Sequence, residues 1–591
     1  MYLLFFHATT MQEETFTRIN YIVVDGDSPP LPGLLRLREV PWRVPEIKQL
    51  IEIRHGFIGS EYLFYQTNIP YKEELPAVLS PIGEPLPDTD LVSKHWPNGF
   101  SSDVFDVILY KPPGKCWTTD TIPPKPRVKK PNIDALGDDE GQAKVIAAVK
   151  KYHTSTLAKP SQFNQFQATE VKIFNGRPQE ADGPPIGLFN PVFDSFQGRI
   201  ASDTFAPTAL QLSNILPLLT ASQKIYDSEP GPDGRTAALT HLLEQILTFD
   251  ILEVSMPKTK SDGLITEADG PHLMFMEVKN EIGTGGCDPS VQGAIAYVSY
   301  WGQAKHEWLR QQCCCPSMIL AIAGPHMSIL GGIMLKRPVI QPLTPYFLVG
   351  NNPSSPGHAN EVAKIFASLA ASLQELRKFY RDFRRTPVIR NPMRHYPYLQ
   401  HFTLDGKRVD LVYTGTLAPT KAVFRGTAQP EGGETFAVIV KFVESYNATA
   451  HRTLEEMNLA PKLIFISSEG PDAFKVAGRI MVVMEDPSYH DLSQSDSPPD
   501  CVLHDVRRAL DALHKKNLVF GDLRPPNILS VREKGRVTGA MLIDFDWCGT
   551  AGEAKYPMDI NFTLDWPEGV GPGLPMFPEH DNEMLKRLSA V

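Results

Sequence analysis

The sequence predicts a multidomain protein of mixed α/β and α+β class. The chain has 591 residues, enough for several domains of about 100–200 residues each. Its residues are 42% hydrophobic and 21% charged, a composition that supports packed cores and argues against extensive disorder. Segments with strand and helix patterns are separated by a Pro/Lys-rich stretch, which indicates more than one folded unit.

Shifts in composition and hydrophobic pattern divide the chain into five predicted parts. These are a small α/β unit at 17–110, a Pro/Lys-rich linker at 111–160, a globular unit at 185–350, a basic helix and connector at 361–399, and a last unit at 400–591. The basic helix carries Arg377 and Arg381 among other cations. Their stripe fits either a phosphate-binding groove or a solvated connector face.

Charge and cysteine content narrow the function classes. The net charge is −10, so the chain as a whole lacks the positive charge of a nucleic-acid-binding protein, and any such site must be local. The seven cysteines lack metal-binding spacing, which indicates reduced thiols. We expect the Cys313–Cys315 triplet at a helix-to-strand junction. No apolar run reaches the ~20 residues of a membrane span, and no secretion signal is recognisable.

The first unit shows the element order of a ubiquitin-like roll. Strand patterns at 18–27 and 34–40 precede a helix pattern at 44–56 that ends at a glycine, and strand patterns follow at 61–71 and 105–111. The run "LFYQTNIPYKEEL" and the later "PLPDTDLVSKHWPNG" resemble the N-terminal domain of Crinkler effector proteins.

A carboxylate and lysine pattern occurs in the second unit. Asp262 is expected to begin one strand of a hairpin, and Glu277 and Lys279 lie two residues apart on the next strand, so both point to the same face. Metal-dependent phosphodiester cleavage needs carboxylates for Mg²⁺ and a lysine that orients water. This arrangement resembles the PD-(D/E)xK restriction-endonuclease superfamily and implies a restriction-endonuclease-like α/β core. We expect Gln292 on the following helix to support the site, and Glu229 or Glu244 to supply an acid.

The last unit contains residues at the spacing of a phosphoryl-transfer site. Lys441 lies in an apolar strand pattern, Asp522 and Asn527 lie five residues apart in "VFGDLRPPNIL", and Asp544 follows the buried strand of "MLIDFDWCG". Such a site positions ATP, metal and acceptor. The order resembles protein-kinase-like domains and implies Asp522 as base, Lys441 on the ATP phosphates, and Asn527 and Asp544 on the metal. Arg524 stands where serine/threonine kinases carry a lysine.

Several positions depart from the kinase pattern. Phe520-Gly521 replaces His-Arg, and Asp546 replaces a glycine. No GxGxxG precedes Lys441, and His451 occupies the position of the usual glutamate partner of that lysine. Only 47 residues follow Asp544, so we expect a bilobal domain with a reduced C-lobe. An ATP-binding pseudokinase that acts as an interaction module is the alternative to an active enzyme.

The whole order resembles the multidomain Crinkler proteins of fungi and oomycetes. The resemblance implies an effector or toxin that is secreted and acts inside a host or target cell, often in the nucleus. It further implies ATP and Mg²⁺ (or Mn²⁺) as cofactors, DNA and an unidentified protein phosphoacceptor as partners, and no membrane association. A structural or purely nucleolytic central domain beside a pseudokinase is the second interpretation.

Overall fold

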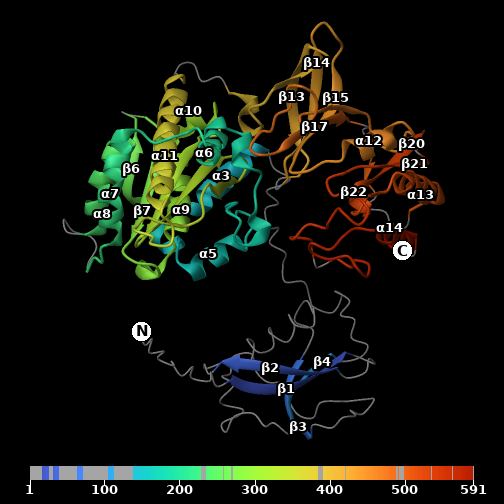
Figure 1. Ribbon diagram of the computed structural model, residues 1–591, viewed down its shortest axis with the longest axis horizontal. Coiled ribbons are helices and arrows are strands. Elements are labelled where there is room, and N and C mark those ends of the chain that lie inside the picture. Colours follow the sequence, from blue (N-terminus) through green and yellow to red (C-terminus); the bar gives the residue numbers. More distant parts are fainter. Residues whose placement is uncertain are drawn as a thin grey trace, which may run out of the picture. The chain divides into compact units, whose positions relative to one another are not determined.

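The computed structural model describes four strands near the N-terminus by their backbone, at 16–25, 31–38, 63–70 and 104–111, and then residues 137–589. Short gaps in the second range are 228–233, 257–258, 268–269, 384–389, 419–420, 487–489, 492–497, 534–535 and 562–563. The chain divides into two compact units, residues 1–128 and 129–591. The fold is mixed α and β with several sheets, as the sequence predicts (Figure 1).

The first unit contains one four-stranded sheet. Its strands are β1 (Phe16–Asp25), β2 (Leu31–Arg38), β3 (Leu63–Pro70) and β4 (Val104–Lys111), in the order β2-β1-β4-β3. β1 pairs antiparallel with β2 and parallel with β4, and β3 pairs antiparallel with β4. The four predicted strands are confirmed, and the predicted helix at 44–56 lies outside the described residues.

The predicted linker at 111–160 is wrong from residue 138 onward. Helices α3 (Asp138–Val149), α4 (Thr154–Leu157) and α5 (Pro160–Gln167) begin there. Val145, Val149 and Leu157 are buried, and α3 and α4 contact helix α9. Because these apolar side chains have a partner surface to cover, the segment folds against the following domain. These helices therefore belong to the same folded part as the sheet that follows, and residues 137–383 are here called the central module.

The central module is built on a mostly antiparallel sheet. Its strands are β5 (Leu252–Met256), β6 (Thr259–Thr266), β7 (His272–Lys279), β8 (Ser317–Ala323), β9 (His326–Met334) and β10 (Pro338–Pro342), in the order β10-β9-β8-β7-β6-β5, with β11 (Phe347–Leu348) on β9. Only the β7–β8 pair among these strands is parallel. Such a pair needs a crossover connection, and α9 (Pro289–Trp301) supplies it.

Helices cover the sheet of the central module. α9 contacts β6, β7, β8 and β9, whereas α11 (His358–Arg381) contacts α6 (Pro191–Ala201), α7 (Ala209–Gln223) and α8 (Arg235–Leu247). Among the described residues, no helix combines the length and apolar character needed to cross a membrane.

Two sequence patterns of the central module, a helix pattern over 291–312 and a strand pattern over 331–340, predict longer elements than the structure contains. The helix predicted over 291–312 stops at Trp301, and only the short α10 (Glu307–Arg310) follows. A Cβ on Gly302 would lie 2.6 Å from Ile146 Cγ2, so the close approach of α3 favours a glycine at this end. The strand predicted over 331–340 is the hairpin of β9 and β10.

The cysteine triplet and the basic stripe have structural roles. Cys313–Cys315 are buried between α10 and β8, as predicted, and none of the three is in a disulfide. Arg377 and Arg381 both form ion pairs with Glu267, and Arg390 and Arg394 do so with Asp139. Four of the cations are therefore paired with carboxylates of the fold, which favours the connector interpretation over a phosphate-binding groove.

The C-terminal module, residues 390–589, begins with a six-stranded antiparallel sheet. Its strands are β12 (His401–Leu404), β13 (Lys407–Thr416), β14 (Val423–Pro430), β15 (Phe436–Val443), β16 (Leu463–Ile466) and β17 (Ile480–Glu485), in the order β12-β13-β14-β15-β17-β16. Helix α12 (Ala448–Glu455) connects β15 to β16. The alternating burial of β13 is that of a strand with one covered face.

The second half of this module packs around one amphipathic helix, α13 (Asp500–Lys515), which buries Val502, Val506, Leu510 and Leu513. The remaining elements are β18 (His490–Asp491), β19 (Leu518–Val519), β20 (Ile528–Glu533), β21 (Arg536–Leu542), β22 (Gly549–Thr550) and α14 (Pro578–Ser589). β18, β20 and β21 form one small sheet, and β19 and β22 form another. These elements appear in orange to red in Figure 1.

One hydrophobic core joins the central module to the six-stranded sheet. It runs from the buried residues of α3 to Val440 and Phe442 on β15. The rings of Phe189 and Phe424 meet edge to face at 6.3 Å between centroids. The first sheet of the C-terminal module therefore has a fixed position on the central module.

Candidate functional sites

The first candidate site lies where β6, β7 and α9 meet. Asp262 is within β6, rather than at its start as expected, and its Oδ2 accepts a hydrogen bond from the Val278 N–H at 2.8 Å. Glu277 and Lys279 follow on β7 at the same-face spacing. The β6–β7 hairpin therefore brings the three predicted side chains together.

Helix α9 supplies the fourth member of this site. Gln292 donates from Nε2 to Glu277 Oε2 at 2.5 Å, and its Oε1 accepts from Lys279 Nζ at 2.7 Å. The helix lies close to the sheet here, because a Cβ on Gly293 would meet Ile319 Cγ2 at 2.6 Å. Asp288 caps the helix through the Ser290 N–H. Gln292, which was predicted to support the site, thus contacts both Glu277 and Lys279 directly.

Glu277 is the electrostatic centre of the site. Its side chain is fully buried, and its Oε1 has no hydrogen-bond partner in the structure. Burial raises the pKa of Glu277 well above its usual value, and the charge of Asp262 adds to this, while Lys279 opposes it. A buried carboxylate with a partnerless oxygen is costly. A bound cation would offset that cost.

The donor atoms fit a hard divalent cation. Mg²⁺ in proteins typically takes one or two carboxylates and completes its shell with water and substrate phosphate oxygens. Asp262 and Glu277 supply such a pair. Within the described residues there is no group of three or more His, Cys, Asp and Glu side chains able to hold a metal ion, so this site has too few protein ligands to enclose a metal fully.

Of the two candidate helix acids, only Glu244 lies among the described residues. Glu244 lies on α8, where its Oε1 accepts from the Ile251 N–H at 2.9 Å, and Glu229 lies outside the described residues. A contact that the sequence did not indicate is that of Cys287, whose Sγ donates to Gln292 Oε1 at 3.1 Å. In the sequence, only the position of Cys287 just before the helix that carries Gln292 pointed to this contact.

The second candidate site lies in the C-terminal module around Lys441 on β15. Lys441 Nζ lies 2.5 Å from Asp544 Oδ1 and 2.7 Å from Asp546 Oδ1. Burial opposes the charge of Lys441, but Asp546 and Asp544 together raise its pKa above the usual value. Lys441 and Asp544, predicted to contact the ATP phosphates and the metal, lie in direct contact with each other, and Asp546 is a second counterion that the sequence did not indicate.

The two aspartates respond oppositely to their surroundings. Burial favours the neutral form of Asp544, yet Lys441 holds its pKa below the usual value. For Asp546, burial raises the pKa to about 7, because Lys441 opposes this only in part and the neighbouring charge of Asp544 adds to it. Asp544 has a φ of +72°, a strained left-handed conformation for a non-glycine residue that is often found at functional sites.

The loop at 520–527 carries the remaining predicted residues. Asn527 Nδ2 donates to the Asp522 carbonyl at 2.9 Å and to Asp522 Oδ2 at 2.8 Å. Arg524 forms a two-point ion pair with Asp522, with Nη2 at 2.6 Å from Oδ2, and its guanidinium lies over the Trp566 ring. Both carboxylate oxygens of Asp522 therefore have partners within the loop.

A buried carboxylate that the sequence analysis did not assign holds this loop. Asp581, on α14, accepts hydrogen bonds from the N–H groups of Phe520 and Gly521, both at 2.8 Å, and from His514 Nε2 at 2.9 Å. Gly521 has a φ of +81°, a left-handed backbone conformation that favours glycine at this position. The "HD" pair of residues 580–581 was the only signal in the sequence.

His451 does not act as the partner of Lys441. It is fully buried, its ring nitrogens bond to the Tyr446 hydroxyl at 2.6 Å and the Pro461 carbonyl at 2.7 Å, and its ring stacks on Phe545. Burial lowers its pKa to about 4. His451 therefore fixes α12 against Phe545, and its candidate role in the site is corrected to a structural one.

A cavity of about 830 Å³ contains Lys441, Asn527, Asp544 and Asp546 in its lining. The β14, β15 and β17 side of this cleft is mainly apolar, with Val423, Ile439 and Met484. Lys421, in the β13–β14 connection, adds a cation that also lowers the pKa of Asp544. An apolar wall with a few convergent charges is typical of a small-molecule site.

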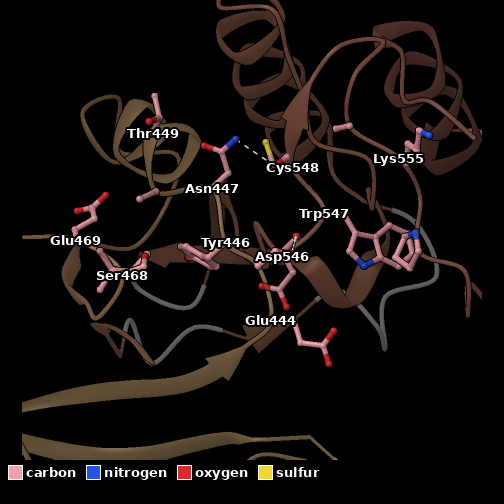
Figure 2. A pocket seen from close by; sticks show the side chains of 15 residues that line it. Glu444, Tyr446, Asn447, Thr449, Ser468, Glu469, Asp546, Trp547, Cys548 and Lys555 are labelled. Carbon is pink, nitrogen blue, oxygen red and sulfur yellow. Dashed lines mark hydrogen bonds between the residues drawn. The ribbon is translucent and has the colours of Figure 1, made fainter. Parts of the chain in front are cut away.

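A second cavity of about 640 Å³ shares Asp546 and Trp547 with the first. Figure 2 shows its wall, in which Asn447 at the start of α12 donates to the Cys548 carbonyl at 3.2 Å. Lys555 also lines it (Figure 2). Asp546 thus lies between two adjoining spaces.

No family model matches this chain, and no curated protein matches it. The geometry of the two sites is therefore the basis for the functional conclusions.

Proposed function

We propose that the C-terminal module binds ATP with a divalent cation and transfers its terminal phosphoryl group. The observation that carries this proposal is the convergence of Lys441, Asp544 and Asn527 in the wall of one cleft, with Asp522 hydrogen-bonded to Asn527. Phosphoryl transfer depends mainly on positioning and charge neutralisation. The cleft provides both, together with an apolar wall for a base.

Each residue has a role in this proposal. Lys441 would leave its aspartate partners to neutralise phosphate oxygens, and Asn527 and Asp544 would hold Mg²⁺. The cation, when bound, supplies positive charge to the phosphates. Asp522 would accept the proton of the acceptor hydroxyl, and Arg524, already beside it, would lie next to the transferred group.

A binding module without transfer is the second candidate for this cleft. It is favoured by the closed network around Asp522, whose carboxylate is taken up by Arg524 and Asn527, and by the two counterions on Lys441. Nucleotide titration and phosphate-transfer assays on the full chain separate the two. Transfer that disappears in Asp522→Ala, while ATP still binds, supports the enzyme. Binding without transfer to any acceptor supports the module, and no nucleotide binding rejects both.

We further propose that the central module cleaves phosphodiester bonds with a divalent metal. The order α8, β5, β6, β7, α9, β8, with β7 parallel to β8, supports the restriction-endonuclease-like interpretation. The decisive observation is the partnerless Glu277 oxygen in a cluster with Asp262, Lys279 and Gln292. Asp262 and Glu277 would hold the metal, and Lys279 would orient the attacking water.

Nicking of supercoiled plasmid by the purified chain with Mg²⁺ or Mn²⁺ tests this second activity. Lys279→Ala should remove cleavage, whereas Lys336→Ala, on a cation in the β9–β10 turn that pairs with Asp138, should retain it. Cleavage that survives Lys279→Ala would point to a contaminating nuclease and would reject the assignment.

On the basis of the Crinkler resemblance, we propose that both activities belong to an effector that acts inside a target cell. The support is the element order of the N-terminal sheet, which fits a ubiquitin-like roll. Expression of the tagged chain in target-type cells tests this: nuclear accumulation and toxicity that depends on Asp522 or Lys279 are the expected results. Harmless, diffuse protein would refute it.

A further inference from the structure

The cleft around Lys441 is not enclosed by the C-terminal module alone. Residues 182–187 and 341–343 of the central module, here called the central wall, line the same cavity as Lys441 and Asp544. We infer that the central wall is the second wall of the nucleotide site, so that a bound nucleotide contacts both modules and holds them together. This inference rests on the ATP binding proposed above.

The central wall is a fixed structure, held by Gln341 at the end of β10. Gln341 Oε1 accepts from the Ile186 N–H at 3.0 Å, and its Nε2 donates to the carbonyls of Gly183 at 3.0 Å and Pro184 at 3.1 Å. One side chain thereby ties the 182–187 segment to the sheet at three points. A surface held in this way can form part of a binding site without reorganisation.

The same wall is anchored to the sheet that carries Lys441. A Cβ on Gly187 would lie 2.7 Å from Ala477 Cβ, so the two modules touch closely at this point. The Tyr398 N–H donates to the Leu188 carbonyl at 2.9 Å, and the Phe189 and Phe424 rings are in contact. The distance across the cleft is therefore set by packing between the modules.

The sequence of the C-terminal module explains why a second wall is needed. Kinase-type sites cover the phosphates with a glycine-rich loop, and no GxGxxG precedes Lys441. The β13–β14 connection contributes Leu417, Ala418 and Lys421 to the cavity, and the central wall provides additional enclosure. Enclosure that a single module usually provides is here divided between two.

A thermodynamic consequence follows. A ligand that contacts both modules binds the docked arrangement better than a separated one, so it must stabilise the docking by the same free energy. Nucleotide binding in the C-terminal module is then thermodynamically coupled to the module that carries Glu277 and Lys279.

Hydrogen exchange of the full chain tests the inference directly. The probe is a non-hydrolysable ATP analogue with Mg²⁺. Slower exchange at 182–188 and around 341–343, together with slower exchange near Lys441 and Asp544, is the expected result. Protection near Lys441 and Asp544 without protection of the central wall would overturn the inference and leave the proposed function standing. No protection in either region would reject the proposed nucleotide binding itself.

A pair of variants provides a second readout. Gln341→Leu removes the three hydrogen bonds that hold the wall and should weaken analogue binding about tenfold, the equivalent of one or two net hydrogen bonds. Thr344→Val is the matched control, because Thr344 also bonds backbone in this region, through Ile329 N–H to its Oγ1 at 2.9 Å, but is not in the cavity wall. Equal affinity in folded Gln341→Leu and Thr344→Val proteins would contradict the inference.

Discussion

Replacement of Glu277 by glutamine tests whether this side chain is a metal ligand or a purely structural carboxylate. Glu277 is fully buried, its Oε1 has no hydrogen-bond partner, and Asp262 lies close enough to disfavour its charge. Glutamine keeps the shape and the contact with Gln292 while it removes the charge. We therefore expect Glu277→Gln to be more stable than the wild type when metal is absent.

The size of the effect follows from the cost of the buried charge beside Asp262, which glutamine does not carry. Because the glutamine amide still faces the partnerless position, we expect a net gain of about 1–3 kcal/mol. In a unit of this size, each kcal/mol of unfolding free energy shifts the melting temperature by about 2 °C. The melting temperature of the metal-free protein should therefore rise by about 2–6 °C. With Mn²⁺ or Mg²⁺ present, the wild type should gain stability as the ion binds. Glu277→Gln should not respond to the ion and should not cut plasmid.

Thermal unfolding by calorimetry in EDTA and in a metal titration measures both effects. Glu244→Gln is the matched control in the same module, because its carboxylate accepts a hydrogen bond from the Ile251 backbone N–H. That variant should keep the metal response. A metal-free Glu277→Gln protein that is less stable than the wild type, or that still responds to metal, would refute the reasoning.

Three further predictions concern other buried charges. Asp546→Asn removes one of the two counterions of Lys441 and should tighten ATP binding severalfold in a calorimetric titration; weaker binding would instead identify Asp546 as a metal ligand. Asp581→Ala leaves the Phe520 and Gly521 N–H groups unpaired and should cost roughly 3 kcal/mol of unfolding free energy in urea, whereas a loss below about 0.5 kcal/mol would contradict the anchoring role. His272 is buried, stacks on Tyr300 and has no partner for either ring nitrogen, and burial lowers its pKa from 6.5 to about 3. Below pH 6.5 the unfolded chain protonates His272 while the folded chain does not, so the free energy of unfolding falls by about 2 kcal/mol at pH 5. His272→Phe should remove this part of the acid destabilisation. A pH profile of stability that is unchanged in His272→Phe would show the argument to be wrong.

Local patterns in the sequence were sufficient to place the chemistry on its elements. The two-residue spacing of Glu277 and Lys279 put both on one face of β7, and the five-residue spacing of Asp522 and Asn527 put both in one loop. Strand periodicity and loop spacing are properties of neighbouring residues. They can therefore be read without knowledge of the tertiary structure.

The helices of 138–167 show where local patterns were insufficient. Prolines and lysines dominate the first part of the predicted linker, and the amphipathic pattern of α3 is weak. Its Val145 and Val149 became core residues only because α9 offers them a surface. Burial of a short segment is decided by its partner, and the partner is remote in sequence.

The sequence by itself determined which residues could act: Asp262, Glu277, Lys279, Gln292, Lys441, Asp522, Asn527 and Asp544. Tertiary structure alone decided what each of them touches. It gave Lys441 a second counterion in Asp546, gave His451 a stacking role on Phe545, tied the 520–527 loop to Asp581, and placed the central wall across the cleft from Lys441. The physical reason is that charge pairing and enclosure depend on distances between segments far apart in the chain, and packing of the whole core sets those distances.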